Sequence, residues 1–334
     1  MSWPESFGTR FTIFVDTEEE FDWSAPLRRE ACATTAIRAL PDAHRRFADR
    51  GVPLTYLVDY PIATSPEAIA VLGALTDDGR SEIGTQLHPW VNPPFEMDIR
   101  EYNGFAGNLP LHLEEAKLVA LTDAIERNFG RRPRVYRAGR YGVGPATPAL
   151  LDRMGYRIDS SMRAGYDYSA QGGPDFTRIG NHGFRFGPGG RMIELPLTTV
   201  FLGLARRRGA AMYRMLGKVP FGRALAARSG VLSRVALTPE DMPVGEAMEA
   251  VRVAVGEGVR VLNLSFHSPS VEPGHTPYVR DARDLAAFHG WWDQVLALLD
   301  RLGVRAATVA DLLAATDACE GTPSSAIGNG AGGL

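Results

Sequence analysis

The fold is indicated by residues 11–23, which read FTIFVDTEEEFDW. Residues 11–15 are apolar and rich in β-branched and aromatic side chains, as is typical of a buried strand. Five of the seven residues from 16 to 22 carry a carboxylate. Carboxylates this close repel one another unless a cation or a proton separates them. Asp16 and Glu18, which share a face in strand geometry, fit a general base and a metal ligand. The competing interpretation is an acidic surface loop in which Asp16 caps a turn.

The rest of the chain alternates predicted strands with predicted helices, which favours a parallel sheet that is closed or nearly closed. Four more predicted strands end in a residue capable of chemistry, namely His88, Arg137, Asp159 and His267. The carboxyl ends of parallel strands meet at one mouth of a barrel. We therefore expect these side chains to form one site.

Each segment taken singly also has a simpler interpretation. His88 fits a metal ligand or a hydrogen-bonded structural histidine. Arg137 and Arg140 fit a clamp for a carboxylate or a salt-bridged loop. His267 with Asp159 fits an oriented general acid or two capped strand ends.

Taken in order, these segments resemble the five motifs of polysaccharide deacetylases of the NodB-homology type (carbohydrate esterase family 4). The resemblance covers about residues 11–315, and it rests on the acidic strand end and on four later segments, which read EIGTQLH (82–88), RAGRYG (137–142), GYRIDSS (155–161) and LSFH (264–267). It implies an α/β fold, a distorted (β/α)7 barrel, and metal-assisted hydrolysis that removes an acetyl group from a sugar.

The resemblance also implies a role for each matching residue. Asp16 is the expected base that activates a water on the metal, and Arg137 or Arg140 is expected to hold it. His267 is the expected acid for the leaving group, oriented by Asp159. The divalent metal, expected to be zinc, is assigned to Glu18, His88 and Gln86. Apart from the resemblance, Trp90 and Tyr141 are candidate substrate contacts, and His275, in a loop expected above the site, fits loop architecture or a substrate contact.

Two positions depart from the pattern of the family. Thr17 stands where a second aspartate is usual, and Gln86 stands where a second histidine is usual. An amide oxygen is a poor zinc ligand beside imidazole, so another group, from Glu20, Asp22 or His112, is a candidate to complete the metal site. The departures keep two alternatives open: a metal-independent amide hydrolase of the same fold, and a non-catalytic glycan-binding member.

The charge of the chain bears on its partners. The net charge is −3, without the clustered basic excess that nucleic-acid binding needs. One local exception is Arg206, Arg207 and Arg208 with Lys218 and Arg223 nearby. This cluster fits a solvated helix face or a patch that meets an anionic lipid or a sugar phosphate.

The chain is expected to form one domain over residues 1–316, with a helical insertion at about 201–240 and a disordered tail at 317–334. No signal peptide and no transmembrane segment is predicted, and two cysteines without a metal or disulfide pattern fit a reducing cytoplasm. Trp291, Trp292 and the insertion are candidate surfaces for a homodimer.

Overall fold

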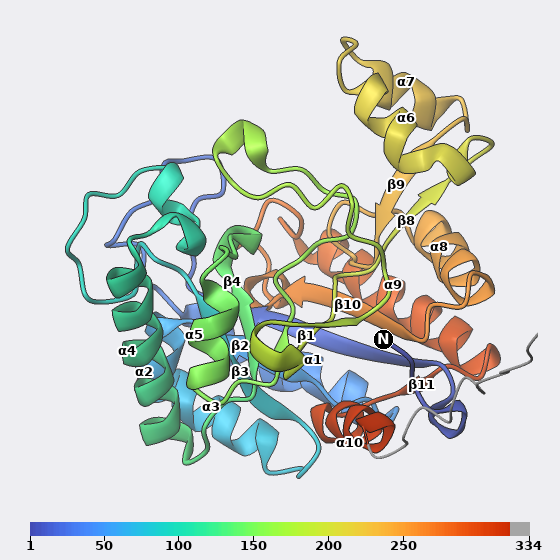
Figure 1. The fold of residues 1–334 in the computed structure, drawn as a ribbon. Helices are drawn as coiled ribbons and strands as arrows, with labels where there is room; N and C mark the ends of the chain where they lie inside the picture. The colour runs from blue at the N-terminus through green and yellow to red at the C-terminus, as the bar shows by residue number, and fades with distance from the viewer. Residues whose placement is uncertain (321–334) are drawn as a thin grey trace, which may run out of the picture.

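Seven parallel strands form the centre of the molecule (Figure 1). The computed structural model describes residues 1–320. The parallel strands follow the order β10-β1-β2-β3-β4-β5-β7, β6 adds an antiparallel edge to β7, and β11 pairs with β1. The strands of this sheet are β1 (Arg10–Thr17), β2 (Thr55–Val58), β3 (Glu82–Leu87), β4 (Val135–Ala138), β5 (Ile158–Asp159), β6 (Phe184–Phe186), β7 (Met192–Glu194), β10 (Val261–His267) and β11 (Arg305–Ala306).

The barrel is closed between β7 and β10 by single hydrogen bonds in place of a ladder. The backbone N–H of Asn263 donates to the hydroxyl of Thr198 (2.9 Å), and the N–H of Thr198 donates to the carbonyl of Asn263 (3.1 Å). The Asn263 amide also donates to the carbonyl of Leu195 (2.8 Å). Seven parallel strands with one irregular seam confirm the predicted distorted (β/α)7 barrel.

Alternation along the strands separates two apolar cores, because successive side chains face opposite sides of a sheet. Ile13 and Val15 of β1 pack outward with the surrounding helices, whereas Phe14 packs inside the barrel. The interior is closed at its lower end by apolar residues of α10. The α-helices around the barrel are α1 (Leu40–Ala48), α2 (Tyr60–Thr64), α3 (Pro66–Thr76), α4 (Leu111–Phe129), α5 (Thr147–Arg153), α8 (Val244–Gly256), α9 (Ala282–Arg301) and α10 (Val309–Glu320).

The insertion expected to be helical begins and ends as β-structure. An antiparallel ribbon of β8 (Thr199–Leu202) and β9 (Ser233–Ala236) carries two short helices, α6 (Gly209–Leu216) and α7 (Gly222–Arg228). Figure 1 shows these helices at the upper right, projecting away from the barrel. β8 reads TVFL, which is rich in the β-branched and aromatic side chains that favour strands.

Two further expectations from the sequence need correction. Trp291 and Trp292 of α9 are buried in the main apolar core, so they are not available as a dimer surface. Helix α10 continues to Glu320, so the first four residues of the predicted tail are helical, and residues 321–334 lie outside the described part of the chain.

Within residues 1–320, the helices are all too short or too polar to cross a bilayer.

Lys117 of α4 anchors the long loop that follows β3. Its ammonium group donates to the carbonyls of Pro89 (3.0 Å), Asn92 and Pro94 (2.7 Å). We expect Lys117→Met, which keeps the aliphatic stem, to lower the free energy of unfolding by about 2–4 kcal/mol, because a hydrogen bond from a charged donor contributes about 1.5–3 kcal/mol. Urea unfolding measures this effect.

The matched control is Lys218→Met, a change at the chain's other lysine, which is exposed. It is expected to change stability by less than about 0.5 kcal/mol. Equal stability of the two variants would contradict an anchoring role for Lys117.

Candidate active site

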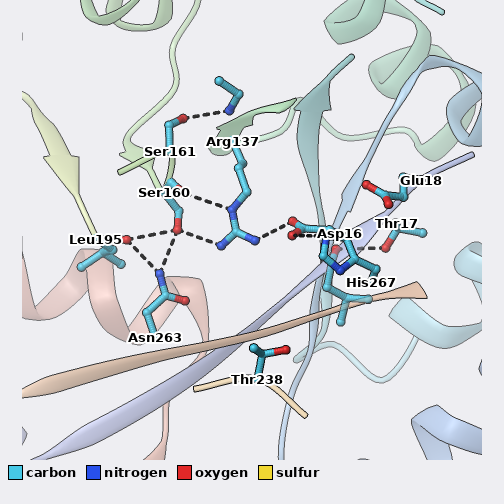
Figure 2. A network of polar contacts seen from close by, with 12 residues as sticks. Asp16, Thr17, Glu18, Arg137, Ser160, Ser161, Leu195, Thr238, Asn263 and His267 are labelled. Carbon is cyan, nitrogen blue, oxygen red and sulfur yellow. Dashed lines mark hydrogen bonds and ion pairs between the residues drawn. The ribbon is translucent and has the colours of Figure 1, made fainter. Parts of the chain in front are cut away.

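An ion pair between Asp16 and Arg137 lies at the centre of the candidate site (Figure 2). Asp16 is near the end of β1 and Arg137 is on β4, and both side chains are buried, with 1% and 0% of their surface exposed. The guanidinium donates to a carboxylate oxygen of Asp16, and it also donates to the carbonyl (2.9 Å) and the hydroxyl (3.0 Å) of Ser160. Three acceptors therefore fix the arginine, which in turn fixes Asp16.

Arg140, the other arginine expected to hold Asp16, lies elsewhere. Its guanidinium pairs with the carboxylate of Glu101 (2.7 Å) and stacks over the ring of Phe105. Arg140 also has a positive φ of 54°, which turns the chain away from the strand direction of β4. The expectation that Arg140 holds Asp16 is therefore wrong.

His267, at the end of β10, is held by a carboxylate that the sequence did not suggest. Its Nδ1 lies 2.7 Å from Glu240, and its backbone N–H donates to the same carboxylate (3.0 Å). The other ring nitrogen, Nε2, lies 3.7 Å from Asp16. Burial lowers the pKa of His267, but the carboxylates of Glu240, Glu18 and Asp16 more than offset this effect and raise the pKa to about 10. The surrounding carboxylates therefore favour the protonated form of the imidazole.

Asp159, which was expected to orient His267, instead bonds to Ser161, two residues further along the chain. Its carboxylate accepts from the backbone N–H (2.9 Å) and the hydroxyl of Ser161. Asp159 is paired with Tyr136 and Glu194 in the sheet, and alternation turns it away from the face on which Ser160 meets Arg137. The predicted contact between Asp159 and His267 is therefore wrong.

His88 is oriented by a buried network beneath it. Its Nδ1 lies 2.8 Å from one oxygen of Glu19, and the other oxygen accepts from the indole of Trp90 (2.7 Å). The backbone N–H of Glu19 donates to Asp59 (2.8 Å), which also caps α2. Gly139 allows this packing, because a Cβ there would lie 2.4 Å from the imidazole ring. With Nδ1 donating to Glu19, Nε2 of His88 is left to face Glu18 (3.5 Å).

Two groups of side chains in this region have the composition of a metal site. In the first, one ligand atom each from Glu19, Asp59 and His88 lies within 4.8 Å of the others. These atoms already bond to one another or to backbone N–H groups, so this group fits a network that orients His88. A carboxylate that receives the second ring N–H is the usual partner of a metal-binding histidine.

The second candidate set is the one expected from the sequence: Glu18, which lies 3.5 Å from Nε2 of His88, and Gln86, which stands two residues before His88. One oxygen of Glu18 and the amide oxygen of Gln86 are buried, and within residues 1–320 they have no hydrogen-bond partner. Burial raises the pKa of Glu18 to about 8, against the attraction of the two histidines. The unpartnered oxygens of Glu18 and Gln86 and Nε2 of His88 are donor types that suit a divalent cation accepting mixed nitrogen and oxygen ligands.

The other groups considered as metal ligands are engaged or distant. Glu20 accepts from Thr35 and the backbone of Ala36, and Asp22 bonds to Ser24. His112 is exposed at the start of α4.

The residues expected to contact substrate are in three different environments. Trp90 is buried and stacks on His88 with ring centroids 4.2 Å apart, so it supports the site from within. Tyr141 stacks on Tyr168. His275 is partly exposed, pairs with Glu20 (3.1 Å), and lines an open groove of about 780 Å³.

Trp23 connects this groove to His267. The indole lines the groove and meets the imidazole edge-on, with ring centroids 4.8 Å apart. An aromatic ring beside the reacting groups provides an apolar face for a ligand. The groove is therefore the structure's candidate for a substrate-binding surface.

Several residues of the site were missed by the sequence reasoning. Asp59 carries the same signal as the residues that were found, because it directly follows a predicted strand. Glu240 is the first acidic residue after an acid-free stretch that begins at residue 195, but no local pattern links it to His267. Glu19 and Trp23 lie inside the acidic segment, where spacing alone does not separate their roles from those of Glu18.

Comparison with known proteins supports the fold. No family model and no curated protein matches the sequence. Among solved structures, the chain is similar to a protein from Mycobacterium smegmatis named as a polysaccharide deacetylase, with 18% identity, coverage of 97% of this chain and 95% of that one, and a TM-score of 0.55.

A second structure named as a polysaccharide deacetylase, from Pseudomonas aeruginosa PAO1, has 14% identity, 92% and 91% coverage and a TM-score of 0.54. PuuE allantoinase has 13% identity, 94% and 91% coverage and a TM-score of 0.56. The chain thus has the fold of polysaccharide deacetylases, as the motifs predicted. Since one fold hosts several activities, the chemistry has to be argued from the site.

Proposed function

We propose that the chain is a hydrolase that removes an acetyl or related acyl group from an amino sugar of a polysaccharide, glycolipid or sugar precursor. The observation that carries this proposal is the pairing of Asp16 with His267. A buried carboxylate held by Arg137 lies 3.7 Å from Nε2 of His267, an imidazole whose pKa is raised by the carboxylates around it. Hydrolysis of an amide needs a base for the attacking water and an acid for the leaving nitrogen, and these two groups fit those tasks.

The roles of Asp16 and His267 follow from which of their oxygen and nitrogen atoms are not engaged by Arg137 and Glu240. Asp16 accepts the proton of the attacking water through the oxygen that faces His267. His267 donates the proton on Nε2 to the leaving nitrogen, while Glu240 holds Nδ1 and fixes the ring. We assign the sugar to the groove beside Trp23 and His275, where an aromatic face and polar groups lie together.

Glu18, His88 and Gln86 would hold a divalent cation, which we propose to be zinc. When bound, the cation polarises the acyl carbonyl and makes water more acidic. Glu19 keeps Nε2 of His88 free for this purpose.

A metal-independent amide hydrolase is the second candidate. It is favoured by the completeness of the Asp16, Arg137, His267 and Glu240 arrangement, which uses none of the three cation ligands. The weak ligand character of the Gln86 amide points the same way.

The deciding experiment measures metal content and acetate release from N-acetylated amino sugars, for the wild type beside His88→Ala. Stoichiometric metal that is lost in the variant together with activity is the expected result. Activity that survives exhaustive chelation would support the second candidate. Sugar binding without turnover, with or without added zinc, would contradict both and indicate a glycan-binding protein.

A further inference from the structure

The hairpin that projects from the barrel is strongly cationic. We define the projecting hairpin as residues 203–232, which contain α6 and α7 and are carried by the β8–β9 ribbon. Residues 195–239 contain no acidic residue, although the chain as a whole has 39 acidic residues against 36 basic ones. The same stretch contains eight cations: Arg206, Arg207, Arg208, Arg214, Lys218, Arg223, Arg228 and Arg234.

Large apolar side chains gather in the middle of the hairpin sequence. Met215, Val219, Phe221 and Leu225 are 69%, 57%, 87% and 70% exposed, and they surround the turn between α6 and α7. Phe221 has a φ of 58°, a conformation that is rare for a bulky residue. The turn therefore places an aromatic ring in solvent at a conformational cost, which is unusual unless another surface covers the ring.

Two of the cations have a structural role at the base of the hairpin. Arg234 lies over the rings of Tyr166 (3.4 Å) and Tyr213 (4.5 Å), and Arg223 lies over Tyr213 (4.4 Å). Arg163 adds a further layer on Tyr166 (3.9 Å). This stack of arginines and tyrosines fixes the hairpin to the barrel in one orientation.

Four other cations are free to meet a partner. Arg207, Arg208, Lys218 and Arg228 are exposed, and they form no ion pair with any residue in the described range. Arg207 and Arg208 precede the exposed apolar residues in the sequence, Lys218 lies among them, and Arg228 follows them. This combination of basic and apolar side chains is characteristic of a segment that lies in the interface of an anionic membrane.

We propose that the projecting hairpin docks on an anionic lipid bilayer. Phe221, Leu225 and their apolar neighbours enter the headgroup boundary, and the free cations meet lipid phosphates. The charge pattern favours this partner. An acid-free hairpin on an otherwise acidic protein turns toward an anionic surface, because the rest of the protein is repelled by it. A free sugar phosphate is less suitable, since the four cations are exposed and are spread from residue 207 to residue 228 along the hairpin.

The test is sedimentation of the full chain with phosphatidylcholine vesicles, with and without phosphatidylglycerol. We expect binding only when phosphatidylglycerol is present. The triple variant R207Q/R208Q/K218Q should lower the partition coefficient by on the order of 100-fold, at about fivefold for each cation. Phe221→Asn, which suits a positive φ, should lower it by about tenfold or more.

The matched control is R45Q/R46Q/R131Q, which makes the same charge change on exposed residues away from the hairpin and should bind vesicles like the wild type. Equal loss in this control, or no binding by the wild type, would overturn the proposal. Release by inorganic phosphate but not by chloride at the same ionic strength would indicate a soluble anion as ligand. A dimer in light scattering that Phe221→Asn dissociates would indicate a second copy of the chain instead.

Discussion

Asp16→Asn is expected to lower kcat by about 10³-fold, within the range of general acid–base catalysis. Asparagine has nearly the same shape, and its amide oxygen can still accept from Arg137, but it cannot take up a proton from water. Steady-state acetate release measures the effect. An Asp16→Asn variant that keeps more than about a tenth of the activity would show that another group is the base.

Stability has to be measured beside activity, because the same change removes the charge that compensates Arg137. Arg137 is fully buried, and a buried charge that loses its partner costs about 3–5 kcal/mol. The double variant D16N/R137M removes both charges and should be more stable than Asp16→Asn alone. It should remain inactive, which separates loss of the base from loss of the fold.

The residues that sequence reasoning found are those at strand ends. Asp16, His88, Arg137 and His267 meet because parallel strands deliver their carboxyl ends to one mouth. Asp159 obeys the same rule, but β5 is only two residues long, and a shift of one position moves a side chain to the opposite face of the sheet. The positions of strands could therefore be predicted from apolar runs. For a very short strand, the side of the sheet toward which each side chain points could not.

Glu240 shows a different limit. It follows β9 and lies 27 positions before His267, so its place depends on how the insertion returns to the barrel. The ribbon delivers it there, because Leu237 bonds to Thr198 on one side and to Ser265 on the other. These are long-range backbone contacts, which the local pattern of residues does not encode.

Glu240→Gln is expected to remove the acid function of His267 and to do so in a pH-dependent way. The variant loses the largest of the attractions that raise the histidine pKa to about 10, so the imidazole loses its proton at lower pH. We expect kcat to fall by about 10²-fold at neutral pH, and the alkaline limb of the pH–activity profile to move to lower pH. Glu246→Gln, at an exposed acid in the first turn of α8, is the matched control and should leave the profile unchanged.

The free energy of unfolding should also depend on pH through the pKa values of His267 and Glu240. The folded-state pKa of His267 lies above its ordinary value of 6.5, so its contribution is complete below pH 6.5 and is lost as the pH rises towards 10. Burial raises the pKa of Glu240, but His267 and the hydroxyl of Ser270 outweigh this effect and lower the pKa from 4.5. The contribution of Glu240 is lost as the pH falls below that value. The loss of stability in Glu240→Gln should therefore be greatest between about pH 4.5 and 6.5 and should shrink towards pH 10. Urea unfolding across this range measures it, and a loss that does not vary with pH would show that Glu240 acts by packing and not by charge.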